Sequence, residues 1–244
     1  MSRREIVAQL AAAQKSNRGA GAYSRLVNRP LGRQIAALAV LAGLGPNQVS
    51  IISACFSYLA IVLVALVSPV PWVGVLIALL LIVGYAFDSA DGQVARLTGR
   101  GSVAGEWLDH VIDAAKIVAL HCAIAVCWYR FFDVRPALLL VPLGYAVVAS
   151  VFFFAIVLAD LLRRIARVKA GGSAVTTASV SPKESAPWLR SLLALPYDYG
   201  LLCIAMAFLG VHTAFVAIYV VLFVGNVLSL VAGCVRWFVE MRTL

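Results

Sequence analysis

Charged residues are scarce in this sequence, and acidic residues are scarcer still. Only 13% of the 244 residues are charged, and Asp and Glu together number 11. A typical soluble domain has about 25% charged residues. The hydrophobic fraction of 63% and the mean hydropathy of +0.96 therefore exclude an ordinary soluble enzyme and favour a membrane protein with several spans and short loops.

Cysteine and histidine are also too few and too scattered to form familiar motifs. The sequence has three histidines, which show no metal-binding spacing, and five cysteines without a Cys-x-x-Cys pair. This pattern excludes a disulfide framework and a zinc site. The cysteines all lie in apolar segments and are expected to be small buried hydrophobic residues: Cys55, Cys122, Cys127, Cys203 and Cys234.

Six apolar runs are long enough to cross a bilayer, which takes ~17–25 residues. They lie near 49–69, 72–95, 105–128, 136–160, 192–212 and 214–236. The connection at 161–190 is basic and rich in Gly, Ser and Thr, so it is predicted to be a long flexible loop. We therefore predict an all-α integral membrane protein with three parts: a basic N-terminal segment (1–48), a six-helix domain (49–238) and a C-terminal tail (239–244).

The N-terminal segment is predicted to contain helices that lie on the membrane surface. Ile6, Leu10 and Ala13 have the spacing of a short amphipathic helix, but for the first fifteen residues we favour a solvated basic tail that only sets the orientation. A second interfacial helix is expected around 28–45, with basic residues at 25, 29 and 33 facing anionic headgroups.

Basic residues predict the orientation. Of the 20 Lys and Arg residues, the six-span arrangement places all but three in the N-terminal segment, the 96–100 connection, the 161–190 loop or the C-terminus. The positive-inside rule then makes both termini cytoplasmic. Charge distributed in this way is a topological signal rather than a nucleic-acid surface, so we expect no nucleic-acid partner. The composition favours a bacterial inner membrane.

Four aspartates are concentrated between positions 88 and 113. Asp88 and Asp91 are three residues apart on one helical face, and Asp109 and Asp113 are four apart on another. A polar stretch between the pairs allows two helices to run antiparallel. Carboxylates at membrane depth are costly unless paired, and four together favour a hard divalent cation such as Mg²⁺, Mn²⁺ or Ca²⁺. A structural ion pair or helix cap is the alternative for any one of them.

The complete pattern resembles the signature of the CDP-alcohol phosphotransferase family, also called CDP-alcohol phosphatidyltransferases. It reads Asp88-x2-Asp91-Gly92-x2-Ala95-Arg96-x8-Gly105-x3-Asp109-x3-Asp113. All eight signature residues are present at the family spacing. The GPNQVS segment at 45–50 is similar to a family turn near the nucleotide, with Gly45 and Ser50 in place of two threonines.

The resemblance implies a metal-dependent enzyme with a donor, an acceptor and a dimeric assembly. The donor is a CDP-alcohol lipid, usually CDP-diacylglycerol; the acceptor is a small polar or lipid alcohol, and CMP is released. Two Mg²⁺ or Mn²⁺ ions are expected, and the expected partners are membrane lipids and a second copy of the chain in a homodimer. By resemblance the metal ligands are Asp88, Asp91, Asp109 and Asp113, with Asp113 also the general base, and the nucleotide-binding residues are Gly92, Ala95, Arg96, Gly105, Asn47 and Ser50.

Several of these residues have simpler interpretations. Gly92 and Gly105 can be helix-packing glycines, and Arg96 can mark the cytoplasmic end of a span. Lys116 is either an acceptor-phosphate ligand or a charge partner of the aspartates. The acceptor-phosphate candidates Arg163, Arg164 and Arg167 are alternatively stop-transfer charges. Asp198 favours a polyol or amine acceptor, or caps a helix.

Two other classes of protein use clustered carboxylates in a membrane. Intramembrane prenyltransferases hold a diphosphate with Mg²⁺, but they normally have about nine spans and lack the glycine and arginine frame. A divalent-cation transporter would place the carboxylates along a pore, whereas this cluster lies near the cytoplasmic end of its spans. Release of CMP distinguishes the phosphotransferase from both.

Overall fold

A computed structural model describes residues 3–12, 21–171 and 197–243 of the chain. All regular elements in these ranges are helices, and five are long and apolar enough to cross a membrane. These five are α3 (Pro46–Leu66), α4 (Pro71–Thr98), α5 (Val103–Phe131), α6 (Leu140–Lys169) preceded by η2 (Pro136–Leu139), and α9 (His212–Met241). The shorter elements are α1 (Arg3–Ala12), η1 (Ser24–Asn28), α2 (Arg29–Leu41), α8 (Tyr199–Ala205) and η4 (Met206–Phe208).

The turn between α4 and α5 is defined by local sequence. Helix α4 is followed by Gly99, whose φ of 64° lies in the left-handed region that favours glycine. Ser102 then caps α5, because its hydroxyl oxygen accepts a hydrogen bond from the Gly105 backbone N–H at 3.0 Å. The polar stretch therefore reverses the chain as predicted, and α4 and α5 run antiparallel.

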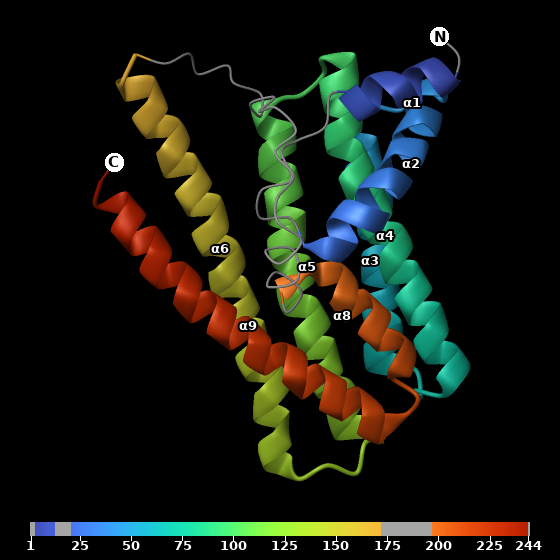
Figure 1. Cartoon of the computed structure of the whole chain (residues 1–244). Coiled ribbons are helices and arrows are strands. Elements are labelled where there is room, and N and C mark those ends of the chain that lie inside the picture. Colours follow the sequence, from blue (N-terminus) through green and yellow to red (C-terminus); the bar gives the residue numbers. More distant parts are fainter. Residues whose placement is uncertain (1–2, 13–20, 172–196, 244) are drawn as a thin grey trace.

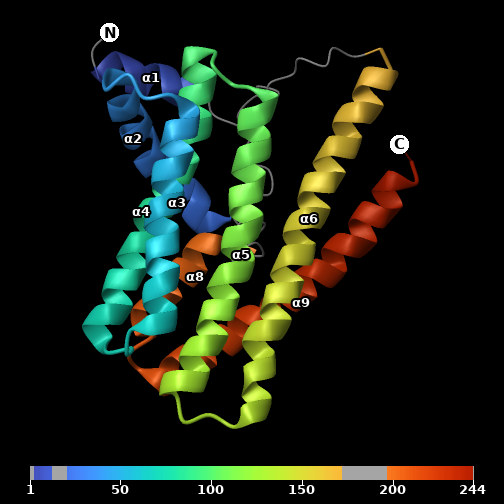
Figure 2. The same cartoon turned by 180° about the vertical axis from the view of Figure 1, so that it is seen from behind.

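Helices α3, α4 and α5 stand side by side. Helices α6 and α9 are tilted away from α5, and they separate from it at the end of the bundle where α6 and α9 both end (Figure 1). The view from behind shows the same divergence (Figure 2). At the opposite end, Trp128 of α5 makes edge-to-face ring contacts with Phe215 and Tyr219 of α9. All three side chains are fully buried, so this aromatic cluster holds α9 against α5 where the helices converge.

The connections alternate between two ends of the bundle. Residues 42–45, 99–102 and the end of α6 lie at one end, and residues 67–70 and 132–135 lie at the other (Figure 1). Among the described basic residues, Arg100 and Lys169 belong to the first end and Arg135 to the second, as predicted.

The N-terminal helices pack across the end of α3 and α4. Ile6 and Leu10 of α1 are 1% and 2% exposed, and they belong to one buried cluster with Ala36 of α2, Val49 of α3 and Val94 of α4. The solvated tail favoured for the first fifteen residues is therefore wrong for residues 3–12, where the alternative, an amphipathic helix, is present and packed. Ala13 lies outside the described residues.

The last third of the chain differs from the prediction. The described part of the expected 192–212 span is the apolar helical stretch Tyr199–Phe208, which is ~15 Å long at ~1.5 Å per residue. This is about half of the ~30 Å hydrocarbon core, so the count of six crossings stays a prediction. Residues 192–196 lie outside the described ranges.

Helix α6 continues through residues 161–169, so the loop predicted for 161–190 is wrong for these residues. The physical reason is ion pairing: Arg164 pairs with Asp160 on the same helix at 2.7 Å, and Arg163 pairs with Glu240 of α9 at 2.6 Å. Such pairs stabilise a helix beyond its apolar stretch. The Gly, Ser and Thr-rich part of the predicted loop lies outside the described residues.

The cysteine prediction was only partly right. Cys127 and Cys203 are buried, but Cys55, Cys122 and Cys234 are exposed on the bundle surface. Lipid is as apolar as a protein interior, so the apolar sequence around a cysteine does not distinguish a core position from a lipid-facing one.

Candidate active site

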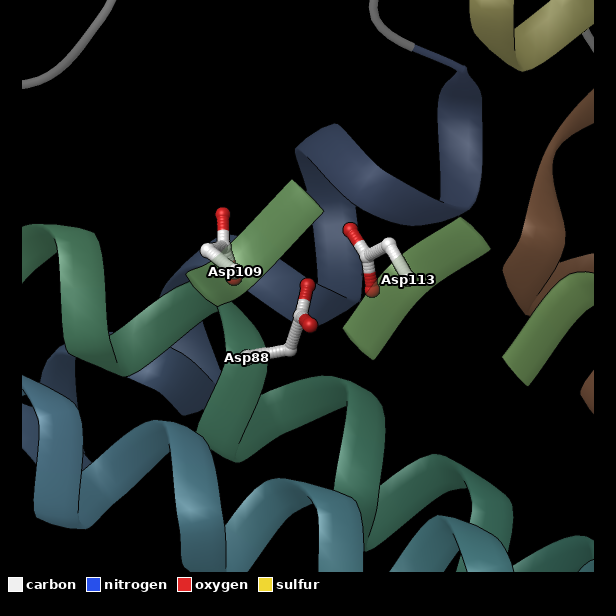
Figure 3. A group of neighbouring side chains, drawn as sticks. All are labelled: Asp88, Asp109 and Asp113. Carbon is white, nitrogen blue, oxygen red and sulfur yellow. The ribbon is translucent and has the colours of Figure 1, made fainter. Parts of the chain in front are cut away.

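Helices α4 and α5 bring three carboxylates together. Asp88 of α4 and Asp109 and Asp113 of α5 each offer an oxygen, and these oxygens all lie within 4.8 Å of one another. Figure 3 shows the three side chains pointing toward one another from the two helices. The predicted convergence of two acidic helical faces is therefore present for these three residues.

Asp91 is held differently from the other three aspartates. It is 6% exposed, and its carboxylate accepts a hydrogen bond from the Ser50 hydroxyl of α3 at 2.5 Å and another from the Gly92 backbone N–H. Asp91 lies outside the group of three oxygens, so it is anchored to α3 beside the cluster. Ser50, chosen from the sequence as a nucleotide-binding residue, thus contacts a signature aspartate directly.

Lys116 is the cation that links the two acidic helices. Its side chain is 4% exposed, and its Nζ lies 2.6 Å from Asp113 and 3.2 Å from Asp88. The same ammonium lies 5.6 Å from the centre of the Tyr199 ring of α8, within cation–π range. Of the two interpretations offered by the sequence, the structure shows the charge partner.

The residues expected to bind the nucleotide gather where α3 and α5 begin. A Cβ added at Gly105 would lie 2.8 Å from Asn47 Oδ1, which is too close for any larger residue without displacement of Asn47. A Cβ at Gly92 would lie 3.4 Å from Arg96 Nη1. The start of α3 therefore contacts the glycine face of α5, and Arg96 extends along α4 beside Gly92.

Asp198 caps a helix, which is one of the two interpretations that the sequence offered for this residue. It is 6% exposed, and its carboxylate accepts backbone hydrogen bonds from Tyr23 at 2.9 Å, Ser24 at 3.3 Å and Gly200 at 3.1 Å. It thus caps α8 and fastens the N-terminal segment to it. Burial, followed by smaller effects of Cys203 and Asp198, raises the pKa of the Tyr23 phenol to about 12, so Tyr23 remains neutral beside this carboxylate.

Two of the arginines at the end of α6, Arg163 and Arg164, form ion pairs with α9, with α5 and within α6 itself. Arg163 contacts Glu240 of α9 through two nitrogens, at 2.6 and 2.8 Å. Arg164 contacts Glu106 of α5 at 2.7 Å as well as Asp160. Arg167 donates to the Arg163 carbonyl oxygen at 3.3 Å. These contacts connect the separated ends of α5, α6 and α9.

A cavity of about 220 Å³ adjoins the carboxylates, and sequence reasoning missed it. Asp88, Asp113 and Lys116 line one part, and His121 and Asn226 line another. A usable signal was present, because His121 and Asn226 are polar residues inside apolar spans, and such residues are functional candidates.

The donor set fits a hard divalent cation. Three carboxylate oxygens within 4.8 Å of one another are the ligand type that Mg²⁺, Mn²⁺ and Ca²⁺ prefer. The Lys116 ammonium, already in contact with two of these carboxylates, shows that the site is built to hold positive charge.

Fold and site together define a helical membrane protein with a partly buried carboxylate cluster formed by two antiparallel helices. The chain belongs to the CDP-alcohol phosphatidyltransferase family, whose family model matches residues 44–238. Members of this family are enzymes that transfer a phosphatidyl group from a CDP-alcohol to an acceptor alcohol in phospholipid biosynthesis. A comparison with curated proteins finds no match.

Proposed function

We propose that this protein transfers the phosphatidyl group of CDP-diacylglycerol to the hydroxyl group of an acceptor alcohol and releases CMP. The observation that carries the proposal is the convergence of Asp88, Asp109 and Asp113 within 4.8 Å in a chain of this family. Inositol phosphate, glycerol phosphate and other alcohols are the acceptors that the resemblance suggests.

The four aspartates would hold two Mg²⁺ or Mn²⁺ ions. When bound, such ions neutralise the pyrophosphate of the donor and the charge that develops on the leaving phosphate. Asp88, Asp109 and Asp113 supply the converging oxygens. Asp91 is the fourth proposed ligand, and its hydrogen bond from Ser50 orients its carboxylate.

Asp113 is proposed as the general base. It removes the proton from the acceptor hydroxyl, whose oxygen then forms a bond to the phosphorus that carries the diacylglycerol. The bond from this phosphorus to the bridging oxygen breaks, and CMP leaves with that oxygen and its electron pair. Lys116, 2.6 Å from Asp113, holds the carboxylate in position.

The nucleotide is proposed to bind on the side of the cluster where α3, α4 and α5 meet. Gly92, Ala95 and Gly105 allow close approach to the backbone, and Arg96 supplies a charge for a phosphate. Asn47 and Ser50 complete this frame from the start of α3.

The proposed setting is a bacterial inner membrane with both termini and the active site at the cytoplasmic face. The support is that α1, the 99–102 connection and the end of α6 lie at one end of the bundle (Figure 1) and carry basic residues such as Arg3, Arg100 and Lys169. A homodimer is proposed from the family alone.

The test is CMP release by the purified protein in detergent or lipid with Mg²⁺ or Mn²⁺, CDP-diacylglycerol and one acceptor at a time. We expect Asp113→Asn to bind the donor but to release no CMP. Retained turnover in that variant would remove the base assignment. A protein that binds neither CDP-diacylglycerol nor metal would contradict the proposed function itself.

A further inference from the structure

The cavity beside Asp113 is elongated along two helices. On α6 its lining runs from Tyr145 to Ile156, which is ~16 Å at ~1.5 Å per residue. On α5 it runs from Asp113 to His121, two helical turns away. An occupant of this cavity therefore has to be long rather than round.

Most of the wall between these ends is apolar. Ile117 and Leu120 of α5, Phe152 and Phe153 of α6, and Leu202 of α8 line it. Apolar walls of this kind stabilise a hydrocarbon body and give a polyol ring nothing to bind.

The cavity is poorly suited to an anion. Among its lining residues in the described part of the chain, Lys116 is the single Lys or Arg, and its ammonium is already in contact with Asp88 and Asp113. A phosphate placed here would meet carboxylates without a cation of its own, which is electrostatically unfavourable in a buried site.

The far end of the cavity contains a buried hydrogen-bonding cluster. His121 is 2% exposed; its Nδ1 lies 2.6 Å from the Tyr219 hydroxyl, and its ring stacks on Tyr145 at 4.1 Å. Asn226 Nδ2 in turn donates to the Tyr145 hydroxyl at 3.3 Å. Helices α5, α6 and α9 thus place polar groups at a depth where polar groups are costly, and three of these residues line the cavity: His121, Tyr145 and Asn226.

The position of the cavity identifies which substrate it serves. Asp113, the proposed base, lines the cavity, whereas the proposed nucleotide frame at Asn47, Gly92, Arg96 and Gly105 does not. The cavity therefore lies on the acceptor side of the carboxylates.

We propose that this cavity is the acceptor site and that it selects an uncharged lipid alcohol rather than a phosphorylated polyol. The inference rests on the proposed function. The acceptor hydroxyl lies at Asp113, its hydrocarbon body follows α5 and α6, and any ester oxygens that it carries lie toward the His121 cluster. Asp113 takes the hydroxyl proton, the acceptor oxygen bonds to the phosphorus of CDP-diacylglycerol, and CMP departs. The product is a phosphodiester with lipid on both sides.

The test compares acceptors in one assay of CMP release and lipid product. Dioctanoylglycerol and decanol represent uncharged lipid alcohols; glycerol 3-phosphate, inositol 1-phosphate and free inositol represent the alternatives. We expect CMP, and a new phosphodiester that joins diacylglycerol to the added alcohol, only with dioctanoylglycerol and decanol. Equal or higher kcat/KM with a phosphorylated acceptor or free inositol would overturn the inference.

Cavity variants locate the acceptor. Ala149 of α6 lines the cavity, and we expect Ala149→Phe to lower kcat/KM for dioctanoylglycerol at least about tenfold, because the ring replaces the acceptor's apolar contacts. The control is Val147→Phe, since Val147 is 64% exposed on the same helix. Tyr145→Phe removes only one hydroxyl and is expected to raise the KM for dioctanoylglycerol. Tyr129→Phe, at an exposed position of α5, is its control. Equal effects of Ala149→Phe and Val147→Phe would contradict the assignment.

A binding measurement separates this inference from the proposed function. Equilibrium binding of dioctanoylglycerol is measured without donor, in wild type and in Ala149→Phe. Binding that Ala149→Phe abolishes, without CMP release from any acceptor, supports the cavity assignment and contradicts the proposed function. CMP release with a phosphorylated acceptor, without dioctanoylglycerol binding, supports the function and overturns the cavity assignment.

Discussion

The ammonium of Lys116 lies 2.6 Å from the carboxylate of Asp113. Asp113 precedes Lys116 by one turn of α5, and the same ammonium also contacts Asp88 of α4. This triangle joins the two helices that carry the acidic signature. It balances part of the negative charge of a buried cluster, and it does so at the residue proposed to act as base. Lys116 is therefore both a structural contact and a neighbour of the reacting atoms.

Replacing Lys116 by Met is expected to destabilise the metal-free protein, because the buried carboxylates lose their cation. Removal of one partner from a buried pair costs about 3–5 kcal/mol. Thermal unfolding in detergent measures the loss, and added Mg²⁺ is expected to restore more stability to the variant than to the wild type. Exposed Arg135→Met is the control. An equal Mg²⁺ effect on both proteins would show that the ammonium and the metal do not share these carboxylates.

Ser50→Ala is expected to weaken metal-dependent binding of CDP-diacylglycerol. The variant leaves the buried Asp91 carboxylate without its 2.5 Å hydrogen bond from α3, and a hydrogen bond to a charged group contributes about 1.5–3 kcal/mol. We expect a loss of about 10- to 100-fold in affinity, since ~1.4 kcal/mol corresponds to tenfold. Titration of donor binding checks this, and Ser50→Thr, which keeps the hydroxyl, should restore it. Failure of Thr to restore binding would assign Ser50 a packing role instead.

Gly105→Ala is expected to lower donor affinity by displacing Asn47, because the new Cβ would lie 2.8 Å from Asn47 Oδ1. The double variant Gly105→Ala with Asn47→Ala removes the obstructing oxygen. If Gly105 serves only to accommodate Asn47, thermal stability returns in the double variant while donor binding remains weak. Recovery of both would show that Asn47 does not contact the nucleotide.

The acidic site was predictable because helical periodicity is local. The spacing of Asp109 and Asp113 alone places both on one face of α5, and the turn at Gly99 returns α5 beside Asp88. The contact of Lys116 with the aspartates was one of the two interpretations that the sequence offered. The extent of the cavity was not predictable, because it depends on how helices distant in sequence pack, although the polar residues His121 and Asn226 were a signal for it. The short α8 was also missed, since hydropathy does not reveal where an apolar run leaves its helix.

Asp198 also lines the cavity, but its carboxylate is engaged by backbone N–H groups, so Asp198→Ala is expected to reduce stability without changing the preference for uncharged acceptors. The substitution leaves the backbone N–H groups of Tyr23, Ser24 and Gly200 without their acceptor, and an unsatisfied buried polar group costs about 1–3 kcal/mol. A lower midpoint of thermal unfolding, with acceptor preference unchanged, is the expected result. A changed preference among acceptors would instead show that Asp198 contacts the acceptor. Asp160→Ala, at a partly exposed position of α6, is the control.

Arg163→Ala distinguishes an ion pair from a phosphate ligand. Arg163 and Glu240 are 31% and 34% exposed, so their pair contributes at most about 1 kcal/mol to stability, and an uncharged acceptor does not need the guanidinium. We therefore expect a small drop in the unfolding midpoint and an unchanged acceptor KM, with Glu240→Gln giving the same result. If Arg163 bound an acceptor phosphate, its replacement by Ala would instead raise the acceptor KM by about tenfold or more, since such hydrogen bonds contribute ~1.5–3 kcal/mol. In that case Glu240→Gln would leave KM unaffected, and the two variants would differ.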